Sequence, residues 1–262
     1  MSSVRVETAG AIATIVIENP GKRNAVNADM WARFEPVLAD LAADASVSVV
    51  VFRGAGTDFS AGADIADLDR ILPETPPPGS PEGGIMTAAE NAIAAFPKPT
   101  IAAIDGYCVG GGWEIAGACD IRIASERSTF GITPSRLGII YPVSGIERVI
   151  AIAGPAVAKH LLYTGELFPA EAALQCGLIT KLLPTEGFWD AANEFTRVLA
   201  SRSQYSIRAM KELVDAIVAG STDIGGIAAK WNAAASEDRS IGMAAFLAKR
   251  APEFTWDGSD GA

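Results

Sequence analysis

The chain has 262 residues, enough for one large domain or for a core with a smaller appendage. Its composition, 49% hydrophobic and 20% charged, is that of an ordinary globular protein, and no stretch has the roughly 20 consecutive apolar residues of a membrane span. A formal net charge of −10 without a long basic run argues against a nucleic-acid partner. The opening residues lack the basic and apolar regions of a signal peptide, so we expect a cytoplasmic protein.

The cysteine and histidine content excludes several kinds of site. The three cysteines, Cys108, Cys119 and Cys176, have no CxxC spacing, so we expect small buried thiols and neither a disulfide framework nor a zinc site. The single histidine, His160, stands in a helical pattern with no second ligand nearby. This argues against a histidine-based metal site and against a Ser-His-Asp triad.

Strand and helix patterns alternate through the first part of the chain. Residues 4–19 predict two strands of a hairpin. Residues 27–44 predict a helix with Asn27 as its N-cap and with a kink or a restricted start at Pro36. Apolar runs predict further strands at 47–54, 99–106 and 120–126. Strands that recur with helices between them are typical of an α/β layer with parallel pairing.

The second part of the chain has a different character. Residues 73–84 are rich in proline and glycine and predict a mobile loop, with a linker between domains as the alternative. After about residue 185 the pattern predicts amphipathic helices and no strand. An apolar stripe at helical spacing comprises Tyr205, Ile207, Met210, Leu213, Val214, Ile217 and Val218. We therefore divide the chain into an α/β core, residues 1–185, and a helical region, residues 186–262.

Glycine-rich turns follow two of the predicted strands. In the first turn the glycines stand at positions 54, 56 and 62, and Phe59 breaks the dinucleotide-binding pattern. Asp58 stands where a nucleophile elbow around Ser60 needs glycine. Two such turns can instead each expose a backbone N–H, and a pair of N–H groups aimed at one point forms an oxyanion hole. The alternative is that the glycines only permit tight turns.

Five segments together resemble one known family, in the same order and over nearly the whole chain. They are ENPGKRNAVN, DFSAGADIADL, IAAIDGYCVGGGWEIAGACDIRIAS, FGITPSRLGI and EDRSIGMAAFLAKRAPEF. These segments are similar to those of the crotonase superfamily, whose best-known members are enoyl-CoA hydratases and isomerases. The resemblance implies an α/β crotonase-like spiral of ββα units with a C-terminal helical region. It also implies a homotrimer or a dimer of trimers and an acyl-CoA thioester substrate, with coenzyme A as part of the substrate and no separate cofactor or metal.

The resemblance also implies roles for particular residues. The N–H groups of Ala63 and Gly111 match the two donors that bind the thioester oxygen in the family. Residues that match the acyl-CoA-binding stretch, or lie close to it, are Ala25, Ala61, Asp64, Ile65 and Ala66. Three cations, Lys22, Arg23 and Lys249, are candidates to meet the phosphates of coenzyme A, with solvated surface charge as the alternative.

Glu114 matches the first of the two acidic residues with which hydratases activate and deliver water. Its alternative role is a capping or surface carboxylate in the first turn of a helix. The second acid of hydratases corresponds to Pro134 here, so a two-carboxylate hydration is in doubt unless Asp64, Tyr141 or the mobile loop replaces it. Isomerisation needs only one base and tolerates this loss better.

Two further activities stay open at this stage. The segment TPSRLGIIY resembles acyl-CoA decarboxylases of the same superfamily, in which a tyrosine at the place of Tyr141 contributes to the site, although those enzymes carry histidine where this chain has Ala63. Tyr141 can equally be a packed aromatic residue. A non-catalytic acyl-CoA-binding paralogue is the second alternative.

Overall fold

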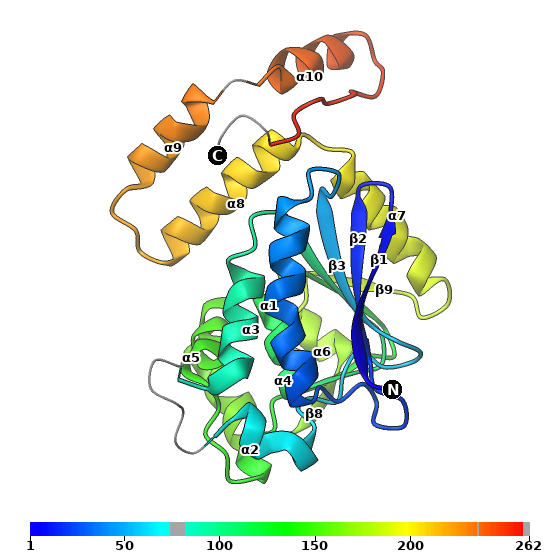
Figure 1. The fold of residues 1–262 in the computed structure, drawn as a ribbon, viewed down its shortest axis with the longest axis vertical. Helices are drawn as coiled ribbons and strands as arrows, with labels where there is room; N and C mark the ends of the chain where they lie inside the picture. The colour runs from blue at the N-terminus through cyan, green and yellow to red at the C-terminus, as the bar shows by residue number, and fades with distance from the viewer. Residues whose placement is uncertain (74–81, 235, 259–262) are drawn as a thin grey trace.

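The fold begins with an antiparallel hairpin. The computed structural model describes residues 1–73, 82–234 and 236–258. Strands β1 (Ser3–Ala9) and β2 (Ile12–Glu18) pair with Val4 opposite Ile17, and this confirms the hairpin expected from the alternating sequence. The strands lie at one edge of the main sheet (Figure 1).

The main sheet has six strands in the order β1-β2-β3-β4-β6-β9. The additional strands are β3 (Val49–Gly54), β4 (Thr100–Ile104), β6 (Ile121–Ser125) and β9 (Lys181–Leu183). From β2 onward all pairs are parallel, as the alternation of strands and helices predicts. Three short strands that the sequence did not predict form a second sheet, β5 (Tyr107–Val109), β7 (Thr129–Gly131) and β8 (Leu167–Pro169).

Helices cover both faces of the main sheet, which is why its central strands β3 and β4 are almost completely buried. On one face Val50 and Phe52 of β3 join a core with α1 (Ala28–Ala43), α3 (Gly84–Ala94) and α4 (Gly111–Ala118). On the other face Val49 and Val51 pack with Phe188 of α7 (Phe188–Ala200). Figure 1 shows α1 and α7 on opposite sides of β3.

Helix α1 confirms the predicted cap and shows that Pro36 does not restrict its start. The side chain of Asn27 accepts a hydrogen bond of 2.9 Å from the N–H of Met30. The helix begins at Ala28 and continues through Pro36 to Ala43, so the proline does not set its start. Burial of Phe34, Val37 and Leu38 on the core side stabilises the helix on both sides of the missing N–H.

Short elements connect the two sheets and surround the ends of their strands. They are the 3₁₀ turns η1 (Ile65–Asp67) and η2 (Pro134–Arg136), and the helices α2 (Leu68–Ile71), α5 (Val143–Thr164) and α6 (Ala170–Gln175). Gly154, with a φ of 79°, interrupts α5. Most of the predicted mobile loop, residues 74–81, lies outside the described residues.

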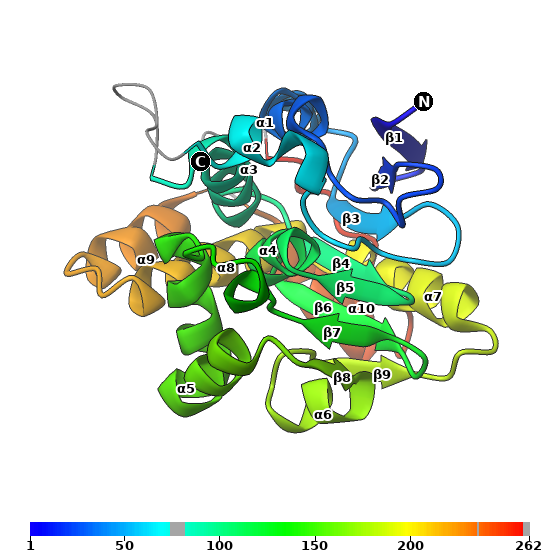
Figure 2. The same cartoon turned by 90° about the horizontal axis from the view of Figure 1, so that it is seen from below.

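Three helices follow α7 and lie beyond the sheets (Figures 1 and 2). They are α8 (Gln204–Val218), α9 (Ile224–Ala233) and α10 (Asp238–Leu247). Four residues of the predicted apolar stripe on α8, Met210, Val214, Ile217 and Val218, are exposed in the single chain. Together these elements confirm the predicted α/β fold with a C-terminal helical region. None of the helices in the described ranges combines the length and the apolar character that crossing a membrane requires.

Candidate functional site

The turn after β3 and the turn after β5 meet at one point. A Cβ atom built on Gly111 would lie 3.0 Å from the backbone nitrogen of Ala63, and one built on Gly62 would lie 3.2 Å from the nitrogen of Gly111. The first turn is held by a bridge between Val26 and Ala63, and the second by the pairing of β5 with β7. The fold therefore brings together two backbone segments almost 50 positions apart in sequence.

The backbone N–H groups of Ala63 and Gly111 differ from those of their neighbours. The neighbouring N–H groups are used: that of Gly62 donates to Ser60 Oγ at 3.1 Å, and that of Asp64 donates to the carbonyl of Val26 at 2.9 Å. Within the described part of the chain, the N–H groups of Ala63 and Gly111 donate to no protein atom. Gly111 opens α4, where such groups are left over by the geometry of a helix start.

The three successive glycines before Glu114 meet different requirements. Gly110 adopts φ 53° and ψ −115°, a conformation that side chains strongly disfavour. At Gly111 a Cβ would press on Ala63 and on the indole of Trp31 at 3.0 Å, and at Gly112 it would lie 2.6 Å from the carbonyl oxygen of Ser60. The glycines thus allow the strand to turn into α4 and allow the two turns to touch.

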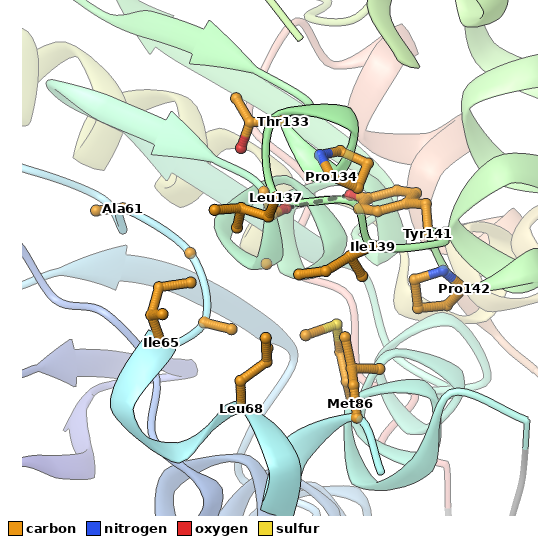
Figure 3. Close-up of a pocket in the computed structure, with 15 residues that line it drawn as sticks. Ala61, Ile65, Leu68, Met86, Thr133, Pro134, Leu137, Ile139, Tyr141 and Pro142 are labelled. Carbon is orange, nitrogen blue, oxygen red and sulfur yellow. Dashed lines mark hydrogen bonds between the residues drawn. The ribbon is translucent and has the colours of Figure 1, made fainter. Parts of the chain in front are cut away.

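A pocket borders these N–H groups and has a mainly apolar wall. It encloses about 490 Å³ of empty space, part of it open to solvent. Figure 3 shows side chains of the η1–α2 segment facing those of the segment that follows β7, with Met86 of α3 at one end. The lining residues are Ala61, Gly62, Ala63, Ile65, Leu68, Leu72, Met86, Gly110, Gly111, Thr133, Pro134, Leu137, Ile139, Tyr141 and Pro142. Such a wall suits an apolar ligand near a polar group that accepts the two hydrogen bonds.

Glu114 lies behind this pocket and is not part of its wall. It is only 1% exposed, and neither of its carboxyl oxygens has a partner with hydrogen-bond geometry among the described residues. Burial raises the pKa of Glu114 well above its usual range, and the negative charge of Glu90 raises it further. Because its charge is so disfavoured, this carboxyl group is suited to holding a proton at neutral pH.

A second buried carboxyl group, Glu90 of α3, adjoins Glu114. Glu90 is fully buried, forms an ion pair with Arg148 and accepts a hydrogen bond of 2.9 Å from Ser144 Oγ. Burial raises the pKa of Glu90, while Glu114, Arg148 and Ser144 lower it in turn. The sequence analysis missed this residue, although a lone charged residue in the apolar segment GIMTAAENAIA was a signal for it.

Tyr141 is the residue that joins the pocket to Glu114. It lines the pocket, is 6% exposed and donates a hydrogen bond of 3.2 Å to the carbonyl of Gly110 (Figure 3). Burial raises the pKa of Tyr141 well above its usual range, and Glu114 and Glu90 add to this effect. The phenol therefore stays protonated, next to the buried acid.

Two other positions matter for the question of a second acid. Pro134, which the resemblance matches to the second acid of hydratases, is buried, begins η2 and lines the pocket with an apolar ring. Asp64, considered as a replacement, accepts a 2.5 Å bond from Lys22 and a 3.3 Å bond from the N–H of Ala66, and it does not line the pocket.

The predicted acyl-CoA-binding residues divide into two groups. Ala61 and Ile65 line the pocket. Ala25 and Ala66 do not line it. Ala25 is buried and lies close in sequence to Arg23, whose carbonyl accepts a hydrogen bond from the N–H of Ala61. These assignments remain predictions.

The three candidate cations occupy different places. Lys22 pairs with Asp64 and keeps half of its side chain exposed. The guanidinium of exposed Arg23 lies 4.5 Å from the ring centroid of Tyr107. Lys249 follows α10, which Figure 1 shows at the opposite end of the molecule from α2, so a single chain does not bring it to the pocket.

The serine, histidine and cysteine residues considered in the sequence do not line the pocket. Ser60 is fully buried and donates a 2.8 Å hydrogen bond to the carbonyl of Asn24. His160 lies on α5, as predicted, and contacts Glu166. Cys108 and Cys119 are buried, as expected, whereas Cys176 is half-buried. In residues 1–73, 82–234 and 236–258, no three His, Cys, Asp or Glu side chains gather as a metal site would require.

Comparison with known proteins identifies the family of the chain. The sequence profile described as enoyl-CoA hydratase/isomerase matches residues 7–257. The chain is similar to the 2,3-dehydroadipyl-CoA hydratase of Escherichia coli, with 31% identity over 97% of this chain and 99% of the relative. It is similar to the short-chain-enoyl-CoA hydratase of Clostridium acetobutylicum, with 29% identity over 95% and 96%.

A solved structure gives the same result. The crystal structure of an enoyl-CoA hydratase/isomerase family member superposes with a TM-score of 0.92 and 40% sequence identity, covering 98% of this chain and 97% of that one. The match of the family profile and the likeness in structure both extend over nearly the whole chain, which confirms the resemblance found in the sequence. The protein belongs to the enoyl-CoA hydratase/isomerase family, a family of enzymes within the crotonase superfamily.

Proposed function

We propose that this enzyme acts on an acyl-CoA thioester and stabilises the enolate of that thioester in an oxyanion hole. The donors are the N–H groups of Ala63 and Gly111. The observation that supports this proposal is their close approach at the edge of an apolar pocket, with no protein acceptor among the described residues. The names of the relatives, which are hydratases of CoA esters, support the same substrate class.

The two donors act on the charge that develops during the reaction. When a thioester becomes an enolate, its carbonyl oxygen gains negative charge, and fixed N–H groups stabilise that charge without reorganising. One such donor contributes about 2.7–4 kcal/mol to transition-state stabilisation in well-studied enzymes. The apolar wall formed by Leu68, Met86 and Ile139 excludes water and strengthens both hydrogen bonds.

Glu114 is the general acid/base of the proposed reaction. It does not line the pocket itself, but it adjoins Tyr141, which does. A proton passes between Glu114 and a bound acyl group either directly, once the acyl group displaces the Tyr141 hydroxyl, or through that hydroxyl as a relay. Burial raises the pKa of Glu114 well above its usual range, which suits a group that must hold and release a proton.

The apolar ring of Pro134 favours reactions that need a single acid/base group. Hydration requires hydroxide delivery to one carbon and proton delivery to another, so two groups share the work. Double-bond isomerisation moves one proton between two carbons and can use Glu114 alone. We therefore place isomerisation above hydration for this chain.

Decarboxylation of a malonyl-type CoA ester is the second candidate, and Tyr141 favours it. This reaction forms the same enolate by loss of CO₂, and the hydroxyl of Tyr141 lies at the pocket wall on the carbonyl of Gly110, beside the oxyanion hole. Incubation with methylmalonyl-CoA and assay for CO₂ tests this candidate directly.

Coenzyme A enters the proposal as part of the substrate, and no further cofactor is invoked. Its phosphates are expected to meet Lys22 and Arg23, which flank the turn beside Ala61. Lys249 takes part only if a neighbouring chain brings it to the pocket.

The proposal is tested with a mass-spectrometric screen of enoyl-, hydroxyacyl- and malonyl-type CoA esters. We expect turnover of at least one ester, and we expect Glu114→Gln to abolish it. Glu147→Gln, a matched change at an exposed position of α5, should leave it intact. Binding without turnover of any ester would identify a non-catalytic acyl-CoA-binding paralogue, and unchanged turnover in the Glu114 variant would refute the assigned role.

We also propose that the chain assembles as a homotrimer or a dimer of trimers. The supporting observation is the apolar stripe on α8, where Met210, Val214, Ile217 and Val218 are 56–69% exposed in the single chain. Sedimentation of the purified protein tests this, and a monomer would contradict it.

A further inference from the structure

The two buried carboxyl groups behind the pocket have opposite surroundings. Glu90 comes from α3 and Glu114 from α4, and these helices pack against each other and against α5. Glu90 is surrounded by donors, whereas Glu114 has none with hydrogen-bond geometry among the described residues. Burial alone cannot produce this difference, because both side chains are almost completely inaccessible.

The donors around Glu90 favour its charged form. Arg148 forms an ion pair with one oxygen, and its second guanidinium nitrogen donates to Asn91 Oδ1 at 2.9 Å, which fixes the orientation of the arginine. The Ser144 hydroxyl donates to the other oxygen at 2.9 Å. These donors oppose the effect of burial on the pKa of Glu90, so Glu90 carries a negative charge more readily than Glu114 does.

Among the described residues Glu114 has neither an ion pair nor a hydrogen bond of standard geometry, and the adjacent Tyr141 hydroxyl donates instead to the carbonyl of Gly110. Glu114 adjoins the first turn of α5, since a Cβ on Gly145 would lie 2.5 Å from each of its oxygens. The N–H groups of a helix start favour negative charge, yet none of them donates to Glu114. An ionised carboxylate in this place would be buried and next to a second negative charge. These effects outweigh the opposing influence of Tyr141 and Arg148, so the neutral acid is the stable form.

We infer that Glu90, held by Arg148 and Ser144, is a positioning residue that keeps Glu114 protonated, so that the site begins its chemistry by donating a proton to the substrate. This inference rests on the proposed function, because it assumes that Glu114 exchanges protons with a bound thioester. It assigns the direction of the first transfer and therefore speaks against isomerisation by Glu114 alone, in which this residue would have to act first as a base.

The proton donation is balanced as follows. The electron pair of the enolate forms a new C–H bond with the proton of Glu114, the thioester carbonyl re-forms, and Glu114 is left as a carboxylate. The enolate must therefore arise without Glu114 acting as base, either by loss of CO₂ from a 2-carboxyacyl thioester or by addition of a nucleophile at the β-carbon of an enoyl thioester. Loss of CO₂ is the favoured route of the two, because it needs no second acid/base group, which the apolar ring of Pro134 would not supply.

The charged and titratable groups that face Glu114 determine its pH dependence. They are Glu90 from α3, Arg148 from α5 and Tyr141 from the segment before α5; Cys108 of β5 acts on Tyr141. Burial contributes most to the raised pKa of Glu114 and Glu90 is the next cause, ahead of the opposing effect of Arg148. Removal of the Glu90 charge should thus lower the pH at which Glu114 loses its proton.

Infrared difference spectroscopy measures this protonation without any substrate. The carbonyl stretch of a neutral carboxyl group, present in the wild type at neutral pH and absent in Glu114→Gln, reports Glu114 directly. In Glu90→Gln we expect the midpoint for loss of this band to fall by roughly one pH unit or more. A wild type without the band at neutral pH, or an unchanged midpoint in Glu90→Gln, would overturn the inference.

The matched control is Asp105→Asn. Asp105 is another buried carboxylate paired with an arginine, Arg127, and the change should leave the Glu114 midpoint unmoved. If Glu90→Gln does not fold because Arg148 loses its partner, the double variant Glu90→Gln/Arg148→Met removes both charges. Its midpoint should also fall, because Glu90 affects Glu114 more than Arg148 does. An unmoved midpoint in the double variant counts against the inference.

The pH profile of turnover separates this inference from the proposed function. If Glu114 donates first, kcat/KM falls as pH rises through its pKa, and Glu90→Gln moves that fall to lower pH. Full turnover in Glu114→Gln would refute the proposed function. Loss of turnover in Glu114→Gln together with a profile that Glu90→Gln does not move, or one that rises with pH, would refute the inference alone.

Discussion

Gly145 lies so close to Glu114 that a Cβ on the glycine would approach each carboxyl oxygen to 2.5 Å. The first turn of α5 therefore forms one wall of the space that holds the buried acid. No side chain other than hydrogen fits there unless the carboxyl group moves. The position of Glu114 is determined as much by α5 as by its own helix.

Gly145→Ala should displace Glu114 and reduce turnover. We expect kcat to fall about 10- to 100-fold, since a shift of about 1 Å in a catalytic group has an effect of this size. Overpacking should also lower the free energy of unfolding by about 1–3 kcal/mol. The control is Gly225→Ala in α9, where nothing lies within 4 Å of the added Cβ. Steady-state kinetics and chemical denaturation measure both effects, and an unchanged kcat in Gly145→Ala would contradict the assigned contact.

Gly111→Ala should damage the oxyanion hole itself. The new Cβ would press on the nitrogen of Ala63 at 3.0 Å, so the two donors would move apart. We expect kcat to fall by about 100-fold or more, as for the loss of one donor. Gly117→Ala on the same helix meets only ordinary contacts of 3.4 Å with Trp113 and should retain activity. Equal activity in the two variants would count against the proposed oxyanion hole.

The burial of Lys98 predicts that the free energy of unfolding changes with pH in the alkaline range. It is 1% exposed and donates to the carbonyls of Leu41 and Asp44 at 2.7 and 2.6 Å. Burial lowers its pKa from 10.5 to about 8. Between about pH 8 and pH 10.5 the unfolded chain binds a proton at Lys98 that the folded chain does not. The contribution of Lys98 therefore makes the free energy of unfolding rise with pH in this range, and below about pH 8 this contribution does not change with pH.

Lys98→Met provides the comparison. Chemical denaturation of both proteins at about pH 7 and about pH 10 should show the wild type gaining stability relative to the variant as the pH rises. At neutral pH the variant should be less stable than the wild type by about 1–3 kcal/mol, because two carbonyl groups lose a donor. A difference that stays constant with pH would contradict the lowered pKa.

Lys22→Gln tests the contact with the nucleotide part of coenzyme A. The ion pair with Asp64 is half-exposed, so its loss should change the free energy of unfolding by less than about 1 kcal/mol. With a CoA ester KM should rise several-fold, whereas with the corresponding pantetheine ester, which lacks the nucleotide phosphates, KM should not change. A similar rise with both esters would show that Lys22 does not meet the phosphates.

The sequence allowed prediction of the elements that carry long, regular patterns. The hairpin, the strands β3, β4 and β6, the Asn27 cap and the amphipathic α8 all follow from local chemistry. The three-residue strands β5, β7 and β8 are too short to have a pattern of their own. The continuation of α1 through Pro36 depends on tertiary burial, which outweighs local propensity.

Some residues of the candidate site could be predicted from sequence motifs and others could not. Motifs singled out Ala63, Gly111, Glu114 and Tyr141, and all of them lie at the pocket or directly behind it. The motif pattern could not reveal Glu90, because the meaning of a lone glutamate in an apolar helix depends on Arg148, which lies 58 positions away. Long-range packing of α3 against α5 decides its role.

The wall of the pocket and the buried acids belong to different parts of the chain. Loops and 3₁₀ turns provide most of the residues that a ligand would touch, whereas three packed helices hold Glu90 and Glu114. Sequence drift in residues 65–72 or 133–140 can thus retune which acyl chains are accepted without disturbing the proton chemistry. Substrate range and proton transfer therefore depend on different segments of this protein. Directed evolution can change the first without altering the second.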